Sequence, residues 1–187
     1  MIQMLDYFVA ILTILYALLL MAYRYWYSKL SIFKPTDIAA PPTQFSIIIP
    51  ARNEAANIKA CVESILAQDY PKDAFEIIVM DDFSEDDTAF IVEALHHQYP
   101  NVHLLRLADY FKPNELTAFK KKAIEKAVSH AKGNWIITTD ADCKVPTKWL
   151  SLYHAYIIKE QPVFVAAPVM FIKTAGVLNQ FQILDFL

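Results

Sequence analysis

The sequence predicts an α/β fold in which helices flank a mainly parallel β-sheet, with a transmembrane helix in front of it. From residue 45 onward, short β-branched and apolar runs alternate with segments whose apolar residues recur at helical spacing. Strands and helices that alternate in this way form βαβ crossovers, which make neighbouring strands parallel. A further observation is an uncharged apolar stretch near the N-terminus, which is typical of a helix that crosses a bilayer.

The N-terminal stretch has no charged residue from Tyr7 to Tyr23, and Asp6 is the only charge before it. Together with residues 2–5 it approaches the roughly 20 residues that a helix needs to cross a bilayer. A signal peptide would need a basic segment before the apolar core, and a buried helix of this length would show a polar face. We therefore expect residues 1–27 to form a transmembrane anchor. Aromatic residues crowd its far end, as at a lipid–water interface: Tyr23, Tyr25, Trp26 and Tyr27.

The charges that flank the apolar run predict its orientation. No basic residue precedes the run and three follow it: Arg24, Lys29 and Lys34. The positive-inside rule then places the chain after the anchor in the cytoplasm, where unpaired thiols such as Cys61 and Cys143 stay reduced. Residues 28–44 are proline-rich and read as a linker, and residues 45–187 as the soluble domain. The expected location is the cell (inner) membrane, with a single N-terminal span.

The first half of the soluble region predicts two strands and two helices. Phe45–Ile49 is a short β-branched run typical of a buried strand. A helix is expected over Asn53–Gln68, with Asn53 as its cap, and a second strand over Phe75–Met80. Asp86 or Asp87 opens the next helix, whose apolar face we expect to contain Phe90, Ile91, Ala94 and Leu95.

The second half continues the alternation. A third strand is expected over Val102–Leu107, followed by an irregular loop to Thr117 and a helix over Ala118–Lys132. Asn134–Thr139 is the fourth predicted strand. Pro146 suits the first turn of a helix that runs to about residue 158, and the last expected strand covers Val163–Ile172.

Composition excludes several classes of function. The chain has 187 residues, a formal net charge of −3 and only two glycines, Gly133 and Gly176. Glycine-rich phosphate-binding loops need closely spaced glycines, so two such distant glycines exclude them. The acidic balance gives no basic surface for nucleic acid, so no nucleic-acid partner is expected. Because ligands of such sheets bind beyond the carboxyl ends of the strands, we expect the site there.

Acidic residues follow three of the predicted strands. Asp140 and Asp142 lie two positions apart, so they can share a face with Ala141 turned away. Two such carboxylates repel unless a cation lies between them, and Mg²⁺ or Mn²⁺ takes oxygen ligands from carboxylates and substrate phosphates. A diphosphate-bearing substrate would suit this site. The structural alternative is a solvated loop that caps the next helix.

The Asp81-Asp82 pair also has two interpretations. It either caps the next helix together with Ser84, Asp86 and Asp87, or Asp82 accepts a hydrogen bond from a base or a ribose. The lysine run at 120–122 is usually a solvated helix start. Cations at a helix N-terminus oppose the helix dipole, however, so an anionic partner such as a diphosphate would relieve a small penalty.

Four ordered elements together resemble the family 2 glycosyltransferases of the GT-A, Rossmann-like fold. They are the P-A-R-N-E segment from Pro50, the D-D-F-S-E-D-D-T turn from Asp81, a lysine before a helix, and the strand-borne D-A-D at 140–142. The resemblance extends over about Phe45–Ile172. It implies a metal-assisted and usually inverting transfer from a nucleotide-sugar donor, expected to be a UDP-sugar, to a lipid or polysaccharide acceptor at the membrane.

The resemblance also implies a role for individual residues. The nucleotide-sugar pocket would be lined by Ala51, Arg52 and Glu54, and Asp82 would contact the base, usually uracil. Lys120, or Lys121 if the alignment slips by one, would approach the diphosphate. Asp140 would face the ribose and the metal, and Asp142 would be the main ligand of Mg²⁺ or Mn²⁺.

The chain departs from the family pattern at two points. Phe119-Lys120 stands where the family often has Gly-Lys, and no acidic pair that would serve as general base follows Asp142. Asp185 is expected to be a surface acid, so we expect the base beyond Leu187 and the sequence to hold only the donor half, inactive by itself. The alternatives are a nucleotidyltransferase and a protein that binds nucleotide-sugars without catalysis.

Overall fold

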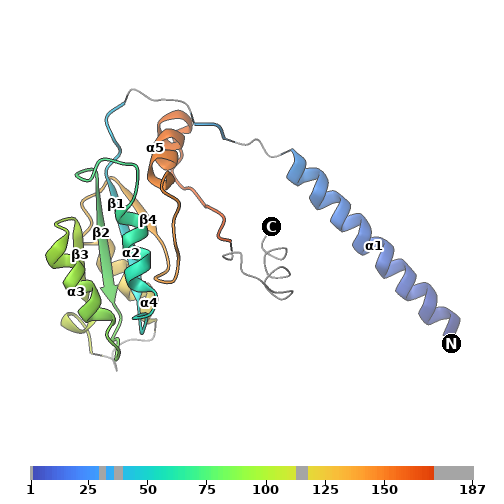
Figure 1. Ribbon diagram of the computed structural model, residues 1–187. Helices are drawn as coiled ribbons and strands as arrows, with labels where there is room; N and C mark the ends of the chain where they lie inside the picture. Colours follow the sequence, from blue (N-terminus) through green and yellow to red (C-terminus); the bar gives the residue numbers. More distant parts are fainter. Residues whose placement is uncertain (1, 30–32, 36–39, 113–117, 171–187) are drawn as a thin grey trace. The chain divides into compact units, whose positions relative to one another are not determined.

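The computed structural model describes residues 2–29, 33–35, 40–112 and 118–170. It divides the chain into two compact units, Met1–Thr36 and Asp37–Leu187 (Figure 1). The first unit contains helix α1 (Ile2–Ser28). Its segment Met4–Ser28 has a hydropathy of 2.2 and is, by length and composition, apolar enough to cross a membrane.

The second unit is built on a four-stranded sheet. The strands are β1 (Phe45–Ala51), β2 (Phe75–Asp81), β3 (Val102–Arg106) and β4 (Trp135–Thr138). Their order across the sheet is β3-β2-β1-β4, and all three neighbouring pairs run parallel. The predicted α/β class with a parallel sheet is therefore confirmed, and the carboxyl ends of β1 and β2 meet at one edge.

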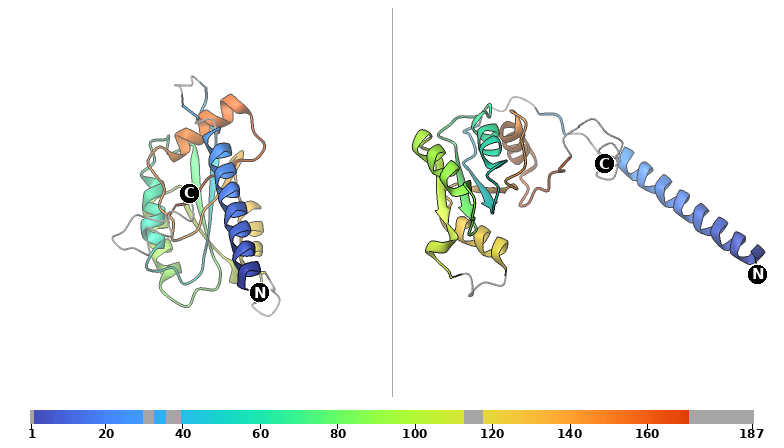
Figure 2. Two further views of the ribbon diagram at one scale, coloured as in Figure 1. Left: turned by 90° about the vertical axis from the view of Figure 1, so that its right-hand side faces the viewer. Right: turned by 60° about the horizontal axis from the view of Figure 1, so that its bottom comes forward.

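Helices connect the strands and cover both faces of the sheet. They are α2 (Ile58–Leu66), α3 (Thr88–Gln98), α4 (Phe119–Val128) and α5 (Trp149–Glu160), with a 3₁₀ turn, η1, at Leu107–Asp109. Apolar residues of α2, α3 and α5 form the main core with one face of β1 and β2. The small residues of α4 pack against the opposite face, and Figure 2 shows the sheet between these layers.

Two expectations about single helices are wrong. Asn53 does not cap α2, which begins five residues later at Ile58. On α3, Leu95 lies in the core and Ile91 packs against it as expected, but Val92 is also in the core, whereas Phe90 is 75% exposed and Ala94 is also exposed. The reason is that α3 presents only a narrow stripe to the sheet, so neighbouring apolar positions face solvent.

The expected last strand is also wrong over the part of it that the structure describes. Residues 163–170 form neither strand nor helix, and Val163 is 99% exposed. An apolar run becomes a strand only where a neighbouring strand offers backbone hydrogen bonds, and the described residues of this segment have none. The remaining two positions of this expected strand, and Asp185, lie outside the described residues.

A hydrogen-bond network closes the amino-terminal edge of the sheet. Ser46 Oγ and the Lys132 backbone N–H both donate to Glu76 Oε1, each at 2.6 Å. The Gly133 N–H donates to Ser46 Oγ at 2.8 Å, and His103 Nε2 lies 3.5 Å from Glu76 Oε2. Glu76 thus joins three strands to the turn before β4.

Candidate functional site

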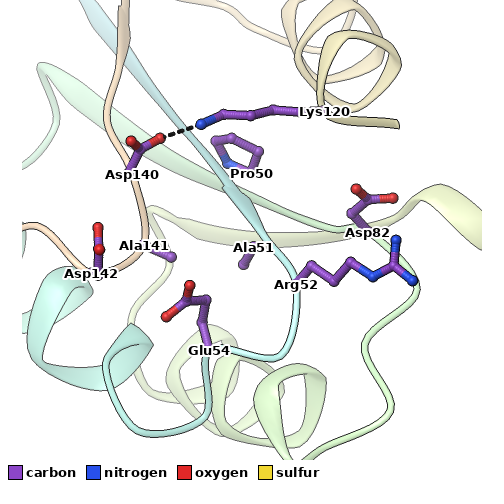
Figure 3. A pocket seen from close by; sticks show the side chains of 9 residues that line it. All are labelled: Pro50, Ala51, Arg52, Glu54, Asp82, Lys120, Asp140, Ala141 and Asp142. Carbon is purple, nitrogen blue, oxygen red and sulfur yellow. Dashed lines mark hydrogen bonds and ion pairs between the residues drawn. The ribbon is translucent and has the colours of Figure 1, made fainter. Parts of the chain in front are cut away.

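A pocket of about 330 Å³ opens at the carboxyl edge of the sheet (Figure 3). Nine residues from three strand ends and from α4 line it. They are Pro50, Ala51, Arg52, Glu54, Asp82, Lys120, Asp140, Ala141 and Asp142. The structure therefore brings together every residue for which the sequence predicts a role in donor or metal binding. Of the three lysines at 120–122, only Lys120 lines the pocket, and Lys122 is paired with Glu125 at 2.9 Å.

The loops after β1 and β2 hold each other in place. Asn53 has a left-handed backbone, with φ of 56°, a conformation that asparagine tolerates better than most residues. Its N–H donates to Ser84 Oγ at 3.0 Å and its Oδ1 accepts from the Glu85 N–H at 2.8 Å. Asp86 Oδ2 accepts from the Ala55 N–H at 3.0 Å. The polar residues after Asp82 therefore form a structural clasp, which fixes the loop that carries the pocket residues.

Asp82 and Arg52 form one end of the pocket (Figure 3). Asp82 is only 6% exposed, and burial raises its pKa, although the positive charge of Arg52 opposes this rise. Asp82 Oδ1 and Asp81 Oδ1 are the two buried side-chain oxygens without a hydrogen-bond partner in the part of the chain that the structure describes. Of these two aspartates, only Asp82 lines the pocket, so one carboxylate at the pocket wall has an enclosed oxygen without a partner.

The D-A-D segment forms the other end of the pocket. It lies in the turn after β4, where the Cys143 N–H donates to the Asp140 carbonyl at 3.2 Å. Ala141 is 3% exposed, whereas the flanking Asp140 and Asp142 are exposed. Lys120 Nζ lies 2.7 Å from Asp140 Oδ1. An ammonium group thus partly neutralises an acidic edge.

Cys61 lies directly behind this acidic edge and had no predicted role. Its thiol donates to the Asp140 carbonyl at 3.6 Å. Burial raises the pKa of Cys61 to about 12, and the neighbouring Cys143 and the negative charges of Asp142, Asp140 and Glu54 contribute to the rise. The three carboxylates therefore act on one point from the same pocket.

The carboxylates fit a hard divalent cation whose coordination is completed by a ligand. Among the described residues, no group of three or more His, Cys, Asp or Glu side chains is arranged to hold a metal by itself. Mg²⁺ typically uses one or two carboxylates together with substrate phosphates. Asp140 and Asp142 supply this number of carboxylates at an open edge.

Two aromatic residues beside the pocket were not predicted as functional. Phe83 follows Asp82 and has a φ of 54°, and Phe119 precedes Lys120. Their ring centroids are 6.0 Å apart in an edge-to-face arrangement. The Arg52 guanidinium carbon lies 5.5 Å from the Phe119 ring centroid. A bulky residue at a positive φ has no sequence signal, because nothing in the local pattern marks that backbone conformation.

Comparison with known proteins points to one family. The family model "Glycosyl transferase family 2" matches residues 46–184. The beta-monoglucosyldiacylglycerol synthase of Synechocystis sp. is 29% identical over 128 residues, which are 63% of this chain and 26% of the relative.

Two solved structures share the fold of the second unit. Staphylococcus aureus TarS (residues 1–349) in complex with UDP-GlcNAc has a TM-score of 0.52 and 27% identity, over 63% of this chain and 32% of that one. The mannosyltransferase PcManGT of Pyrobaculum calidifontis, in complex with GDP-Man and Mn²⁺, has a TM-score of 0.58 and 26% identity, over 74% and 39%. The chain thus spans well under half the length of the proteins to which it is similar.

Proposed function

The chain belongs to glycosyltransferase family 2, and on this premise we propose that its pocket binds the nucleotide-sugar donor of a glycosyl transfer. The observation that carries the proposal is the convergence, in one pocket, of a buried acceptor oxygen, a lysine and paired carboxylates. Each of these groups matches one part of a nucleoside diphosphate sugar. The sugar would leave the diphosphate for an acceptor hydroxyl, and we expect the anomeric configuration to be inverted.

The buried end of the pocket suits the nucleobase. The Asp82 carboxylate lines the pocket and would accept a hydrogen bond from a ring N–H of a base. Uracil offers a single N3–H donor, and guanine offers N1–H together with an exocyclic amine, so the carboxylate accepts from either. We expect uracil. The two similar structures with bound donors carry UDP-GlcNAc and GDP-Man, so both bases enter the test below.

The open end of the pocket suits the diphosphate and a divalent metal. Asp140 and Asp142 would hold Mg²⁺ or Mn²⁺, and Lys120 would face the phosphates. Such a metal stabilises the negative charge that develops on the leaving diphosphate. The Mn²⁺ in the complex of PcManGT supports this assignment. Lys120 is placed to move from Asp140 to a phosphate oxygen, since an ammonium group rotates freely and binds both anions.

Calorimetry on the purified chain tests the proposal. The titrants are UDP and GDP, each with and without Mn²⁺. We expect UDP to bind more tightly in the presence of Mn²⁺, and Asp142→Ala to abolish this metal dependence. The matched control is Asp109→Ala, which removes an exposed aspartate of η1 that lies outside the pocket. Failure of both nucleotides to bind with Mn²⁺ would refute the donor-site assignment.

The acceptor and the location are proposed from the first unit. Because α1 is apolar enough to cross a membrane, we propose an acceptor at the membrane surface, a lipid or a growing polysaccharide. The relative named for a glycolipid product supports the lipid. A membrane-impermeant maleimide tests the cytoplasmic placement. It should label Cys143, which is partly exposed, only after intact cells are permeabilised. Labelling in intact cells would contradict the orientation.

A further inference from the structure

Two histidines meet at the amino-terminal end of β3, an edge strand of the sheet. His96 lies in the last turn of α3, and His103 is the second residue of β3. Only residues 99–101 separate the two elements, which lie side by side (Figure 1). The centroids of the two imidazole rings are 6.0 Å apart. Two imidazoles that bind one metal ion through nitrogens at about 2.0–2.1 Å have centroids roughly 5–6.5 Å apart, so these rings are spaced as a pair of metal ligands.

The oxygen partners of the two rings determine which nitrogens are free. His96 Nδ1 lies 2.6 Å from the Val102 carbonyl oxygen, and because a carbonyl can only accept, Nδ1 carries the proton. His103 Nε2 lies 3.5 Å from Glu76 Oε2, and the carboxylate places the proton on Nε2 for the same reason. The lone pairs are then left on His96 Nε2 and His103 Nδ1. Neither of these nitrogens has a hydrogen-bond partner among the described residues.

These oxygen contacts are the ones that metal-binding histidines make. Such a histidine donates its other ring N–H to a carbonyl or a carboxylate, which fixes the ring and makes the free nitrogen a better ligand. His96 has a carbonyl in this position and His103 a carboxylate. Burial lowers the pKa of His103, as do Lys132 and His96, whereas Glu76 opposes the shift. The His103 imidazole is therefore neutral at pH 7, which is the form that binds a metal.

We propose that His96 Nε2 and His103 Nδ1 bind a divalent transition-metal ion, such as Ni²⁺, Zn²⁺ or Cu²⁺. Imidazole nitrogens suit these metals, whereas Mg²⁺ and Mn²⁺ prefer oxygen ligands. Because His96 is exposed and His103 is half-buried, water can fill the remaining coordination positions. The ion fastens the last turn of α3 to β3. This two-histidine site is independent of the donor pocket, which lies at the carboxyl ends of the strands.

His97 provides a matched control. Its ring centroid lies 5.7 Å from that of His96, but consecutive residues of a helix do not face each other. Its Nε2 lies 3.8 Å from Glu93 Oε1, one turn back along α3. His97→Gln therefore removes an imidazole from the same helical turn without removing a ligand of the two-histidine site.

Thermal unfolding of the full chain in detergent, with and without Ni²⁺, tests the proposal. Every protein tested also carries Asp142→Ala, which removes a competing carboxylate ligand of the donor pocket. A ligand that binds only the folded protein raises its melting temperature. We expect Ni²⁺ to raise the melting temperature of the parent chain and of His97→Gln, and to leave those of His96→Gln and His103→Gln unchanged. Each variant is compared with its own metal-free value, so a folding defect does not imitate the result.

Calorimetry with Ni²⁺ measures the affinity directly. Loss of an oxygen partner of a metal-binding histidine costs about 10- to 100-fold in metal affinity, and loss of the histidine should cost no less. We therefore expect His96→Gln and His103→Gln each to weaken Ni²⁺ binding at least about tenfold. Absence of Ni²⁺ binding to the parent chain, an equal loss in His97→Gln, or a loss in only one of the two ligand variants would overturn the proposal.

Discussion

Replacement of Lys120 by methionine should move two binding constants in opposite directions. In the structure Lys120 Nζ lies 2.7 Å from Asp140 Oδ1, and both side chains are mostly exposed, by 64% and 60%. The lysine thus occupies one of the two carboxylates assigned to the metal. Without a nucleotide, a metal ion must displace it. With a donor bound, the same lysine would stabilise the phosphates.

The exposure of the pair sets the magnitude. Exposed ion pairs contribute about 0.2–1 kcal/mol, and 1.4 kcal/mol corresponds to a tenfold change in affinity. Lys120→Met should therefore raise the affinity of the free protein for Mn²⁺ by no more than about fivefold, and change its stability by less than about 1 kcal/mol. A hydrogen bond to a charged group contributes about 1.5–3 kcal/mol. The affinity for UDP with Mn²⁺ should accordingly fall by about 10- to 100-fold.

Electron paramagnetic resonance of free Mn²⁺ measures the affinity of the nucleotide-free protein for the metal. Calorimetry with UDP at saturating Mn²⁺ measures the affinity for the nucleotide. Lys121→Met is the matched control, because it removes a neighbouring positive charge that does not line the pocket. A Lys120→Met protein that loses affinity for both metal and nucleotide would refute the competition. Equal effects of the two variants would show that only the net charge of α4 matters.

Three further predictions follow from single contacts. A Cβ on Gly133 would lie 2.5 Å from the Ser46 backbone nitrogen, so Gly133→Ala should destabilise the second unit by about 1–3 kcal/mol in denaturant unfolding. Because burial raises the pKa of Asp82 from its usual 3.8, the native protein keeps this proton to higher pH, and stability falls as the pH rises above 3.8. Asp82→Asn should then raise the melting temperature at pH 7 and give no gain at pH 3. A thiol reagent at pH 8 should modify Cys143 at least about tenfold faster than Cys61, whose pKa burial raises to about 12; peptide mass spectrometry resolves the two.

The sequence predicts the strands well because their signal is local. Phe45–Ala51 and Phe75–Asp81 are β-branched runs buried almost throughout, and continuous apolarity is what a parallel strand between two helical layers requires. The apolar run after α5 carries the same local signal but does not form a strand, because a strand also needs a neighbouring strand to pair with its backbone. Apolarity alone supplies no hydrogen bonds.

Turns and helix starts are less predictable because distant residues determine them. Asn53 has the composition of a cap, but it binds Ser84 and Glu85 from the next loop, about thirty residues away. Of the two acids expected to open α3, Asp87 makes no capping side-chain bond, whereas Asp86 Oδ1 accepts from the Thr88 N–H at 3.0 Å. The predicted Asp140 and Asp142 do reach the pocket, since the carboxyl ends of parallel strands must meet at one edge. Which lysine joins them depends on the rotation of α4, which the sequence leaves open between Lys120 and Lys121.

Acidic side chains at the two edges of the sheet differ in how many hydrogen-bond partners they have within the protein. At the amino-terminal edge, Glu76 accepts from Ser46 and from the Lys132 backbone and faces His103. Oε1 of this carboxylate accepts two hydrogen bonds, so it stabilises the turn before β4. At the carboxyl edge, Asp82 is more enclosed, at 6% exposed, yet one of its oxygens has no partner. A buried unpaired acceptor costs about 1–3 kcal/mol. A ligand that donates to the Asp82 carboxylate would offset part of this cost, so ligand binding should also stabilise the loop after β2.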